Sequence, residues 1–357
     1  MDFSITPDQR LMQESLSRTL ADVSSLERVR RFAGGDERRD VHDALAEFGL
    51  TGILVPEEYG GLGLKLLDAA LAAEALGRAV TPGPFLGACV LAPLAFRLAG
   101  SAEQQAAWLP RIASGERVFG MAIAEPIAGA RDGAGVKVSD GRLTGTALFV
   151  TDAMSADHFI VADMSGGLHL VDADAPGLTR APMTSIDRTR PLGELRFEAT
   201  PAEALGGGAL ERLRDAGWAM LAADTLGAAD VMIEKAVAYA KEREQFGRVI
   251  GSFQAVKHMC AEMAAELEPC RSLVWYAAYA FDEAPQEAAL VAAHAKAHTS
   301  EVGRFIARTA TEVHGGMGIT DLLGLHFWFK RIGLNRQLLG GPERVRRLAA
   351  QMQGLAA

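Results

Sequence analysis

The stretch that most constrains the fold is Leu210–Lys241, a long run of helix-forming residues without a proline. Two further helical patterns, Ser252–Tyr279 and Ala288–Glu312, follow it and are separated by a break at Ala284-Pro285. Long helices joined by short connections pack as antiparallel neighbours. The C-terminal part of the chain is therefore predicted to form an up-and-down four-helix bundle.

The last part of the chain is predicted to contain shorter elements. They are a glycine-rich turn at His314–Thr320, a helix at Asp321–Arg331, a loop at Asn335–Gly341 and a final helix at Pro342–Met352.

Short helices are also predicted before residue 118. Thr6 is a suitable N-cap because proline follows it at the first helical position. The glycine-rich segment Leu50–Leu64 lacks the flanking strand and helix of a phosphate-binding loop, so we interpret it as a structural turn. The helices predicted around it are Val41–Phe48, Leu66–Arg78, Phe85–Ala99 and Glu103–Ile112.

Between the two helical parts, short apolar runs separated by Gly, Asp and Pro extend from Val118 to about Leu205 and are typical of strands. Gly206-Gly207-Gly208 reads as a linker. The sequence thus predicts an α+β protein with segregated layers. We expect an N-terminal all-α domain at 1–117, a middle β-barrel or β-sandwich domain at 118–205 and a helical bundle at 206–357.

The composition argues against several classes of protein. The chain has 357 residues and a net charge of −9, so a nucleic acid is not expected as its partner. The chain lacks an uncharged apolar run of about 18 residues, which argues against a membrane span. The first ten residues are polar and acidic, unlike a signal peptide. Three cysteines without a C-x-x-C pair favour a reduced, cytoplasmic location.

One corner of the predicted bundle has the residues for binding a diphosphate. Arg243 closes the incoming helix, the chain turns at Phe246-Gly247, and Gln254 opens the next helix. A guanidinium group makes bidentate hydrogen bonds to phosphate. A helix start adds free N–H donors and a positive dipole end. The alternative is an ordinary surface corner with an exposed arginine, because a short motif alone is weak evidence.

Five motifs in order decide between these interpretations, and together they resemble the acyl-CoA dehydrogenase family over almost the whole chain. The motifs are EEYGGLGL (Glu57–Leu64), AIAEPIAG (Ala122–Gly129), the strand Leu143–Thr151, EREQFGRVIGSFQ (Glu242–Gln254) and EVHGGMGIT (Glu312–Thr320).

The resemblance implies FAD bound across a subunit interface. In the family, the R-x-x-F-G corner and the G-G turn hold the adenosine diphosphate of the neighbour's FAD. Glu312 stands where the family usually has Gln, and a carboxylate beside a pyrophosphate is unfavourable unless it turns to a ribose hydroxyl or to an arginine. The residues that correspond to this neighbour-facing set are Arg243, Phe246, Gln254, Glu312, Gly315 and Gly316.

The set that would face the chain's own flavin ring is less complete. Ala124 replaces a Thr and loses a hydroxyl donor, a loss of about 1 kcal/mol. Phe149 replaces a Trp, and Ala130 replaces a Ser near the CoA and the flavin. The resemblance implies that the ring is lined by Met121, Ile123, Ala124, Phe149 and Thr151.

Both positions where the family places its catalytic Glu lack a carboxylate. Family members use that Glu to take a proton from the carbon alpha to the thioester while a hydride moves to the flavin. The usual position corresponds to Leu339, and the alternative one, on the first helix of the bundle, corresponds to Gly217. Neither residue can accept a proton. The next position, often an Arg near the substrate, is Trp218.

Four hypotheses follow from these departures. The chain is a subunit lacking the base in a hetero-oligomeric acyl-CoA dehydrogenase, of the kind that acts on bulky or steroid-type acyl-CoA. Its expected partners are then an acyl-CoA substrate, a homologous subunit with the Glu, and electron-transfer flavoprotein or a similar acceptor. Alternatively, it is a homo-oligomeric FAD enzyme with a relocated base, a flavoenzyme with monooxygenase-type chemistry, or a non-catalytic scaffold.

Other polar residues are interpreted structurally. His294 and His298 are spaced to share a metal ion, but without an adjacent Glu they are expected to be solvated. Cys260 and Cys270 read as small core residues on an Ala-rich helix. We interpret Asp187–Arg190 as a turn with a salt bridge, with a CoA contact as the alternative. The arginines of the last helix are expected on a solvated or inter-subunit face; they are Arg344, Arg346 and Arg347.

Overall fold

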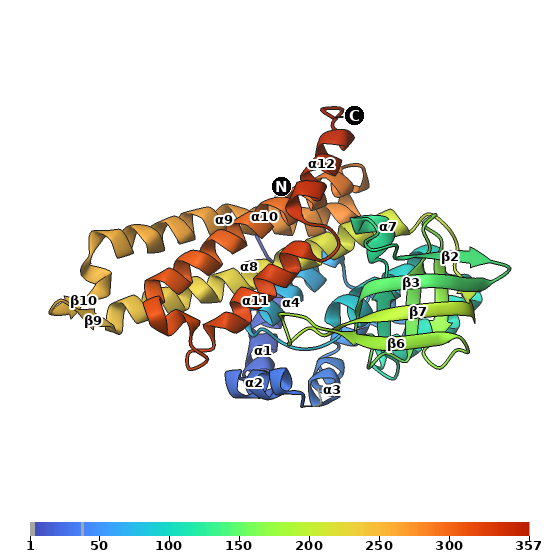
Figure 1. The fold of residues 1–357 in the computed structure, drawn as a ribbon, viewed down its shortest axis with the longest axis horizontal. Helices are drawn as coiled ribbons and strands as arrows, with labels where there is room; N and C mark the ends of the chain where they lie inside the picture. The colour runs from blue at the N-terminus through green and yellow to red at the C-terminus, as the bar shows by residue number, and fades with distance from the viewer. Residues whose placement is uncertain (1–3, 37–38, 357) are drawn as a thin grey trace.

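The computed structural model describes residues 4–36 and 39–356, so the first three residues of the N-terminal segment considered above lie outside it. Long helices form one end of the molecule and the β-sheets form the other, with the first helices packed along one side (Figure 1). The predicted α+β class, with an N-terminal helical part, a middle β part and a C-terminal helical part, is confirmed.

Most N-terminal helices agree with the predicted ones to within a few residues, but the helix Leu26–Gly34 has no counterpart among the predicted helices. Thr6 caps the first helix in a capping box with Gln9, as its sequence context indicates. The helices are α1 (Pro7–Val23), α2 (Leu26–Gly34), α3 (Arg39–Glu47), α4 (Leu66–Arg78), α5 (Ala92–Ala99) and α6 (Ala102–Ala113), with 3-10 turns at η1 (Leu50–Gly52) and η2 (Glu57–Tyr59).

The segment Leu50–Leu64 is the structural turn that its sequence indicates. A Cβ added at Gly61 would lie 2.1 Å from the carbonyl oxygen of Val55. Only glycine permits so close a backbone approach. In contrast, the single helix predicted at Phe85–Ala99 is wrong in detail, because its first half is a π-helix, η3 (Phe85–Leu91), whose residues are all buried.

Two four-stranded sheets make up the middle part. One has the order β1-β4-β5-β8 with β1 parallel to β4, and the other has the order β2-β3-β7-β6 with antiparallel pairs. A separate apolar core that includes Leu143, Phe159 and Leu195 joins them, as in a sandwich. The elements are β1 (Phe119–Ala122), α7 (Ala124–Ala128), β2 (Gly135–Ser139), β3 (Arg142–Thr151), β4 (His158–Ala162), β5 (Leu168–Asp172), β6 (Leu178–Met183), β7 (Leu192–Pro201) and β8 (Glu203–Ala204).

The C-terminal helices form the predicted bundle. The loop predicted at Asn335–Gly341 is wrong at its start, because the preceding helix continues to Gln337 and Asn335 is buried within it. The elements are α8 (Leu210–Glu242), β9 (Glu244–Gln245), β10 (Arg248–Val249), η4 (Ile250–Ser252), α9 (Gln254–Glu283), α10 (Pro285–His314), η5 (Gly315–Ile319), α11 (Leu325–Gln337) and α12 (Pro342–Met352).

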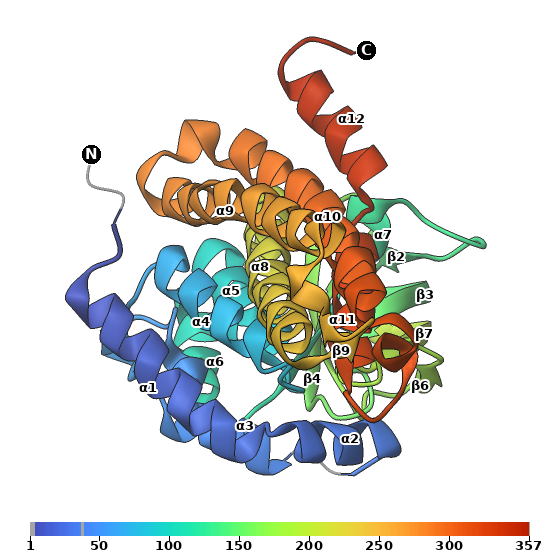
Figure 2. The ribbon, with the colours of Figure 1, turned by 90° about the vertical axis from the view of Figure 1, so that its left-hand side faces the viewer.

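Helix α8 is central to the molecule: α4, η3, α9, α10 and α11 all pack against it, and α12 projects away from the body (Figure 2). Two glycines allow α4 and α8 to touch. A Cβ at Gly77 would lie 2.1 Å from Asp224 O, and a Cβ at Gly227 would lie 2.0 Å from Glu74 O. Within the described ranges, the structure contains no helix that is both long enough and apolar enough to span a membrane.

Candidate cofactor and substrate site

The predicted diphosphate corner lies at the exposed tip where α8 passes into α9. Arg243 is the residue that follows α8, and its carbonyl oxygen accepts a hydrogen bond from Ile250 N–H at 2.7 Å. A tight hairpin turn at Phe246-Gly247 connects β9 and β10, with positive φ angles of 53° and 74°. Arg243 and Gln254 are exposed, and Phe246 is 91% exposed. The corner therefore presents its side chains outward, where a second chain can reach them.

The glycine turn lies next to this corner. The ring of Tyr239, one helical turn before Arg243, stacks on the ring of His314 with centroids 4.6 Å apart. His314 directly precedes Gly315, whose φ of 58° suits glycine. A Cβ at Gly315 or Gly316 would meet nothing within 4 Å, so space is open there. Glu312 is exposed nearby. The fold thus brings the two predicted diphosphate-binding segments together at one end of the bundle.

The residues predicted to face the chain's own flavin ring meet where β1 and β3 approach each other. Met121, Ile123, Ala124 and Thr151 are buried, and the Oγ1 of Thr151 accepts a hydrogen bond from Met121 N–H at 3.2 Å. Phe149 is half-buried and has a φ of 56°.

The side chains of Met183 and Arg131 lie next to Phe149. Its N–H donates to Met183 Sδ at 3.3 Å, and the guanidinium of Arg131 lies 5.5 Å from its ring centroid. One face of the Phe149 ring is therefore partly covered by Arg131.

The two positions that correspond to the family's catalytic Glu are in contact. Leu339 follows α11, Gly217 lies in the second turn of α8, and both are buried. A Cβ placed on Gly217 would lie 2.6 Å from Leu339 Cδ1. The indole Nε1 of Trp218 donates to Leu339 O at 2.8 Å. Neither position therefore presents a carboxylate, and the Leu339 side chain fills the space that a side chain on Gly217 would need.

A pocket opens beside Leu339 and is also lined by residues predicted to face the flavin ring. It is lined by Ala124 and Phe149 from the β part and by Leu339 after α11. Glu125 lines the same pocket and is the one acidic residue among its described lining residues. Burial raises the pKa of the Glu125 carboxyl, although Leu148 N–H donates to its Oε1 at 2.7 Å.

Glu125 is a candidate that the sequence does not single out. The residue is visible in the AIAEPIAG motif, but nothing in the motif shows that its side chain is buried in a pocket beside Leu339.

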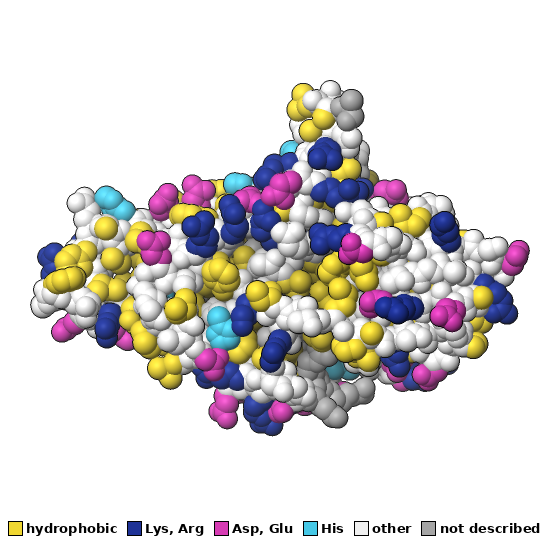
Figure 3. Space-filling view, viewed as in Figure 1, with side chains coloured by type: hydrophobic (Ala, Val, Ile, Leu, Met, Phe, Trp, Pro, Cys, Tyr) yellow, Lys and Arg dark blue, Asp and Glu magenta, His cyan; other side chains and the backbone are white. Residues whose placement is uncertain are grey.

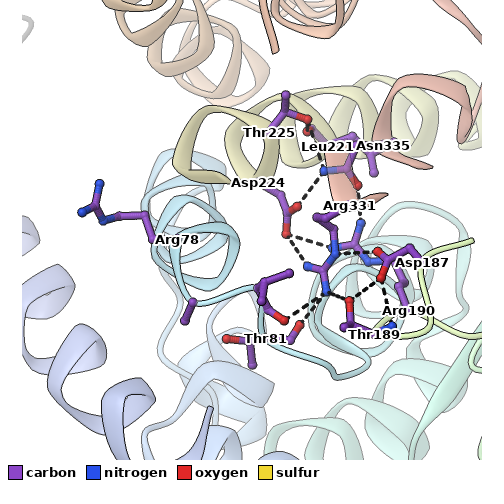
Figure 4. Close-up of polar contacts among 12 residues, drawn as sticks. Arg78, Thr81, Asp187, Thr189, Arg190, Leu221, Asp224, Thr225, Arg331 and Asn335 are labelled. Carbon is purple, nitrogen blue, oxygen red and sulfur yellow. Dashed lines mark hydrogen bonds and ion pairs between the residues drawn. The ribbon is translucent and has the colours of Figure 1, made fainter. Parts of the chain in front are cut away.

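Asp187, Thr189 and Arg190 of the polar cluster belong to a largely buried network, whereas Arg188 is exposed (Figure 4). Arg331 is fully buried, and its Nε and Nη1 donate to Asp187 at 2.9 Å and to Asp224 at 3.1 Å. Its Nη2 donates to Thr81 O and to the Thr189 hydroxyl. The residues form the expected turn with ion pairs. Arg188, the exposed arginine of this turn, donates to Ala33 O at 3.4 Å, and a CoA contact through it stays a prediction.

The network balances its buried charges. Burial opposes the ionisation of Asp224, but the Arg190 and Arg331 guanidinium groups outweigh it and hold the pKa of that carboxyl below its usual range. Lys296 lies beside the network and donates to Asn335 O. Burial, with the nearby Arg336 and Arg190 charges, lowers the pKa of Lys296 to about 7.

The remaining sequence candidates lie apart from these sites. His294 and His298 are exposed on α10, and the part of the chain that the structure describes contains no group of three or more residues placed to hold a metal ion. Cys270 is buried and Cys260 half-buried, as expected for packing residues. Arg344, Arg346 and Arg347 are exposed, and basic side chains lie along α12 and the helices at its base (Figure 3).

Comparison with known proteins places the chain in a family. Residues 6–116 match the model "Acyl-CoA dehydrogenase, N-terminal domain", and residues 209–354 match "Acyl-CoA dehydrogenase, C-terminal domain". The acyl-CoA dehydrogenase IpdE2 of Mycolicibacterium smegmatis is 33% identical over 307 residues, covering 86% of this chain and 85% of that protein.

Two solved structures are similar over nearly their whole length. The ChsE4-ChsE5 complex from Mycobacterium tuberculosis matches with a TM-score of 0.91 and 27% identity, covering 100% of both chains. The Tcur3481-Tcur3483 steroid ACAD matches with a TM-score of 0.89 and 31% identity, covering 97% of this chain and 98% of the other. The chain belongs to the acyl-CoA dehydrogenase family, and it is an oxidoreductase of that class.

Proposed function

We propose that the chain is the subunit lacking the base in a hetero-oligomeric, FAD-dependent dehydrogenase of bulky, steroid-type acyl-CoA. The observation that carries the proposal is the contact between Leu339 and Gly217. Neither known base position carries a carboxylate, and the Leu339 side chain occupies the space that a side chain on Gly217 would need. The partner would be a homologous subunit that carries the catalytic Glu, and electron-transfer flavoprotein or a similar protein would accept the electrons.

The residues at the exposed corner suit the diphosphate of a partner's FAD. Arg243 would make charge-assisted hydrogen bonds to it, and the first N–H groups of α9, which begins at Gln254, would add donors. The open space at Gly315 and Gly316 allows close approach of a ligand to the backbone. Glu312 would have to turn to a ribose hydroxyl or to Arg243 to avoid repulsion.

The residues around Phe149 fit a flavin ring less well. Arg131 and Met183 already contact Phe149, and Ala124 offers no hydroxyl donor. When bound, FAD supplies the hydride acceptor for the dehydrogenation. In this proposal the chain's own contribution is to hold the partner's cofactor at Arg243, while Leu339 excludes substrate from its own site.

Relatives that form complexes support this reading. The ChsE4-ChsE5 structure is a complex of two named chains, and the Tcur3481-Tcur3483 structure carries two names and is described as a steroid ACAD. A two-subunit assembly and a steroid-type substrate are therefore reasonable for this chain as well.

The test is to produce this chain together with a homologous chain that carries the Glu, and to measure FAD per subunit in the purified complex. One FAD for each pair of unlike subunits is expected, with the flavin ring in the partner's β part. One FAD for every copy of this chain, with the ring against Met121–Ala124 and Phe149–Thr151, would contradict the proposal. A colourless complex without flavin absorbance would favour the scaffold alternative.

Glu125 favours a second candidate function, a homo-oligomeric flavoenzyme with a relocated base. Its buried carboxyl has a raised pKa and lines the pocket beside Leu339. If this candidate is correct, the purified chain alone binds FAD and oxidises an acyl-CoA, and Glu125→Gln abolishes the turnover without loss of flavin. Flavin-dependent oxygen consumption by the chain alone would instead favour monooxygenase-type chemistry.

A further inference from the structure

A small cavity lies where the N-terminal helices, the β part and the bundle meet. Its polar lining residues are Thr81, which follows α4, Arg190, which precedes β7, and Asp224 of α8. Each of the three parts of the chain therefore supplies one polar group, and all three groups belong to or adjoin the buried network (Figure 4). The rest of the wall is mainly apolar and includes Leu45, Leu76, Phe85, Leu86, Met220 and Leu221.

The size of the cavity restricts what it can hold. The centre of a water molecule has ≈ 20 Å³ in which it can lie. About 10–15 Å³ of such space is sufficient for one water. The cavity therefore suits a single water molecule and is too small for an organic ligand.

The hydroxyl of Thr81 is the polar group that most needs a partner in this cavity. Thr81 is 6% exposed, and its Oγ1 is buried without a hydrogen-bond partner among the described residues. Most buried polar side-chain atoms are bonded to protein or to ordered water. Because Thr81 lines the cavity, a molecule inside it is within reach of this hydroxyl.

The other two polar residues have hydrogen-bonding capacity left. Arg190 donates through Nη1 to Asn335 and through Nη2 to Asp224, and a guanidinium group has five N–H donors. The Asp224 carboxylate accepts from Arg190, Arg331 and Asn335, and a carboxylate has about four acceptor sites. A molecule that both donates and accepts hydrogen bonds can therefore bond to all three lining residues.

The charges of the network favour a neutral molecule. Arg190 and Arg331 already pair with Asp224 and Asp187, so the network requires no further ion. An added ion would be a buried charge without a partner of opposite sign, which is costly. Water is neutral, and a buried water typically makes about three hydrogen bonds, the number that this cavity offers.

We propose that this cavity binds one ordered water molecule, which accepts a hydrogen bond from Arg190, donates one to Asp224 and shares one with Thr81 Oγ1. The water joins the N-terminal part, the β part and the bundle at a single point. The site depends neither on the flavin nor on the catalytic base, so it is independent of the proposed function.

The first test is thermal unfolding of Thr81→Val, a change that replaces the hydroxyl by a methyl group of similar size, in the purified native assembly. If the water is bound, the change removes one of its three hydrogen bonds, and Tm is expected to fall by about 1–4 °C. If the hydroxyl has no partner, an apolar group in its place removes a desolvation cost, and Tm rises instead. A raised Tm would therefore overturn the proposal.

A matched control assigns the effect to this cavity. The hydroxyl of Thr200 is also buried without a partner among the described residues, but it lies on β7 and does not line the cavity. Thr200→Val is expected to leave Tm unchanged or to raise it. An equal fall of Tm in both variants would show that the loss at Thr81 is not due to a water in this cavity.

A high-resolution crystal structure of the parent protein tests the site directly, even if Thr81→Val does not fold. We expect an ordered water within about 3.2 Å of Thr81 Oγ1 and of polar atoms of Arg190 and Asp224. Thr81→Ser keeps the hydroxyl and should keep this water. The absence of an ordered water from this position in the parent would overturn the proposal.

Discussion

The indole Nε1 of Trp218 donates a hydrogen bond to the backbone carbonyl of Leu339 at 2.8 Å. This bond joins the first helix of the bundle to the loop after α11. Leu339 is held there with a φ of 57°, a conformation that is unfavourable for a residue with a side chain. The hydrogen bond to Trp218 therefore helps to hold Leu339 against Gly217 in this unfavourable backbone conformation.

The contact between Gly217 and Leu339 predicts a non-additive pair of substitutions. Gly217→Ala should destabilise the protein by about 1–3 kcal/mol, because the new methyl group would overlap Leu339 Cδ1. In a Leu339→Ala background the same change should be neutral or stabilising, since alanine is favoured over glycine within a helix by about 0.5–1 kcal/mol. Chemical unfolding of the four proteins measures the coupling. Additive effects would show that the two residues are not in contact.

The purified chain without a partner is expected to have little or no acyl-CoA dehydrogenase activity. Neither Leu339 nor Gly217 can accept the proton that the reaction releases, and loss of a positioned general base costs about 10²–10⁴ in rate. A dye-reduction assay with a panel of acyl-CoA thioesters measures this, and the complex with the Glu-bearing subunit is the positive control. Robust turnover by the chain alone would exclude its role as the subunit without a base.

Arg243→Ala should weaken FAD binding in the assembled complex by roughly 10- to 100-fold, the effect of losing a charge-assisted hydrogen bond of about 1.5–3 kcal/mol. Lys241→Ala is the matched control, since it removes a positive charge from the last turn of α8 without altering the corner. Flavin fluorescence titration of the two apo-complexes measures both affinities. Equal FAD affinity in the Arg243→Ala complex and the parent would remove this corner from the binding site.

The lowered pKa of Lys296 predicts that the free energy of unfolding depends on pH. Its pKa in the folded protein, about 7, lies below the ordinary value of 10.5. Between these values the unfolded chain binds a proton that the folded protein does not, so this group makes the free energy of unfolding rise with pH by up to about 1.4 kcal/mol per unit. The full destabilisation is present below pH 7 and disappears as the pH rises towards 10.5.

Lys296→Met should remove this slope. Urea unfolding between pH 7 and pH 9 is expected to show a smaller rise in stability for the variant than for the parent, and a more stable variant at pH 7. Parallel curves for the two proteins would show that Lys296 is ionised alike in the folded and unfolded states.

Local sequence patterns determined the helices and the order of the layers. The sequence predicts the helix Leu66–Arg78 with its observed ends, because its apolar residues recur at helical spacing and helix-breaking residues follow it. The run Leu210–Lys241 differs from α8 by a single residue. The R-x-x-F-G corner was also visible, because a turn between two long helices is a local feature of the chain.

The buried polar network and the contacts around the base positions were decided only by the tertiary structure. The sequence predicts a loop at Asn335, but the residue is helical, and its amide donates to Asp224 and Thr225, more than a hundred residues away in sequence. The buried position of Arg331 and the contact between Gly217 and Leu339 also depend on residues that are far apart in sequence. Spacing along the chain reports only near neighbours, whereas these sites arise from packing between segments that meet only when the chain folds.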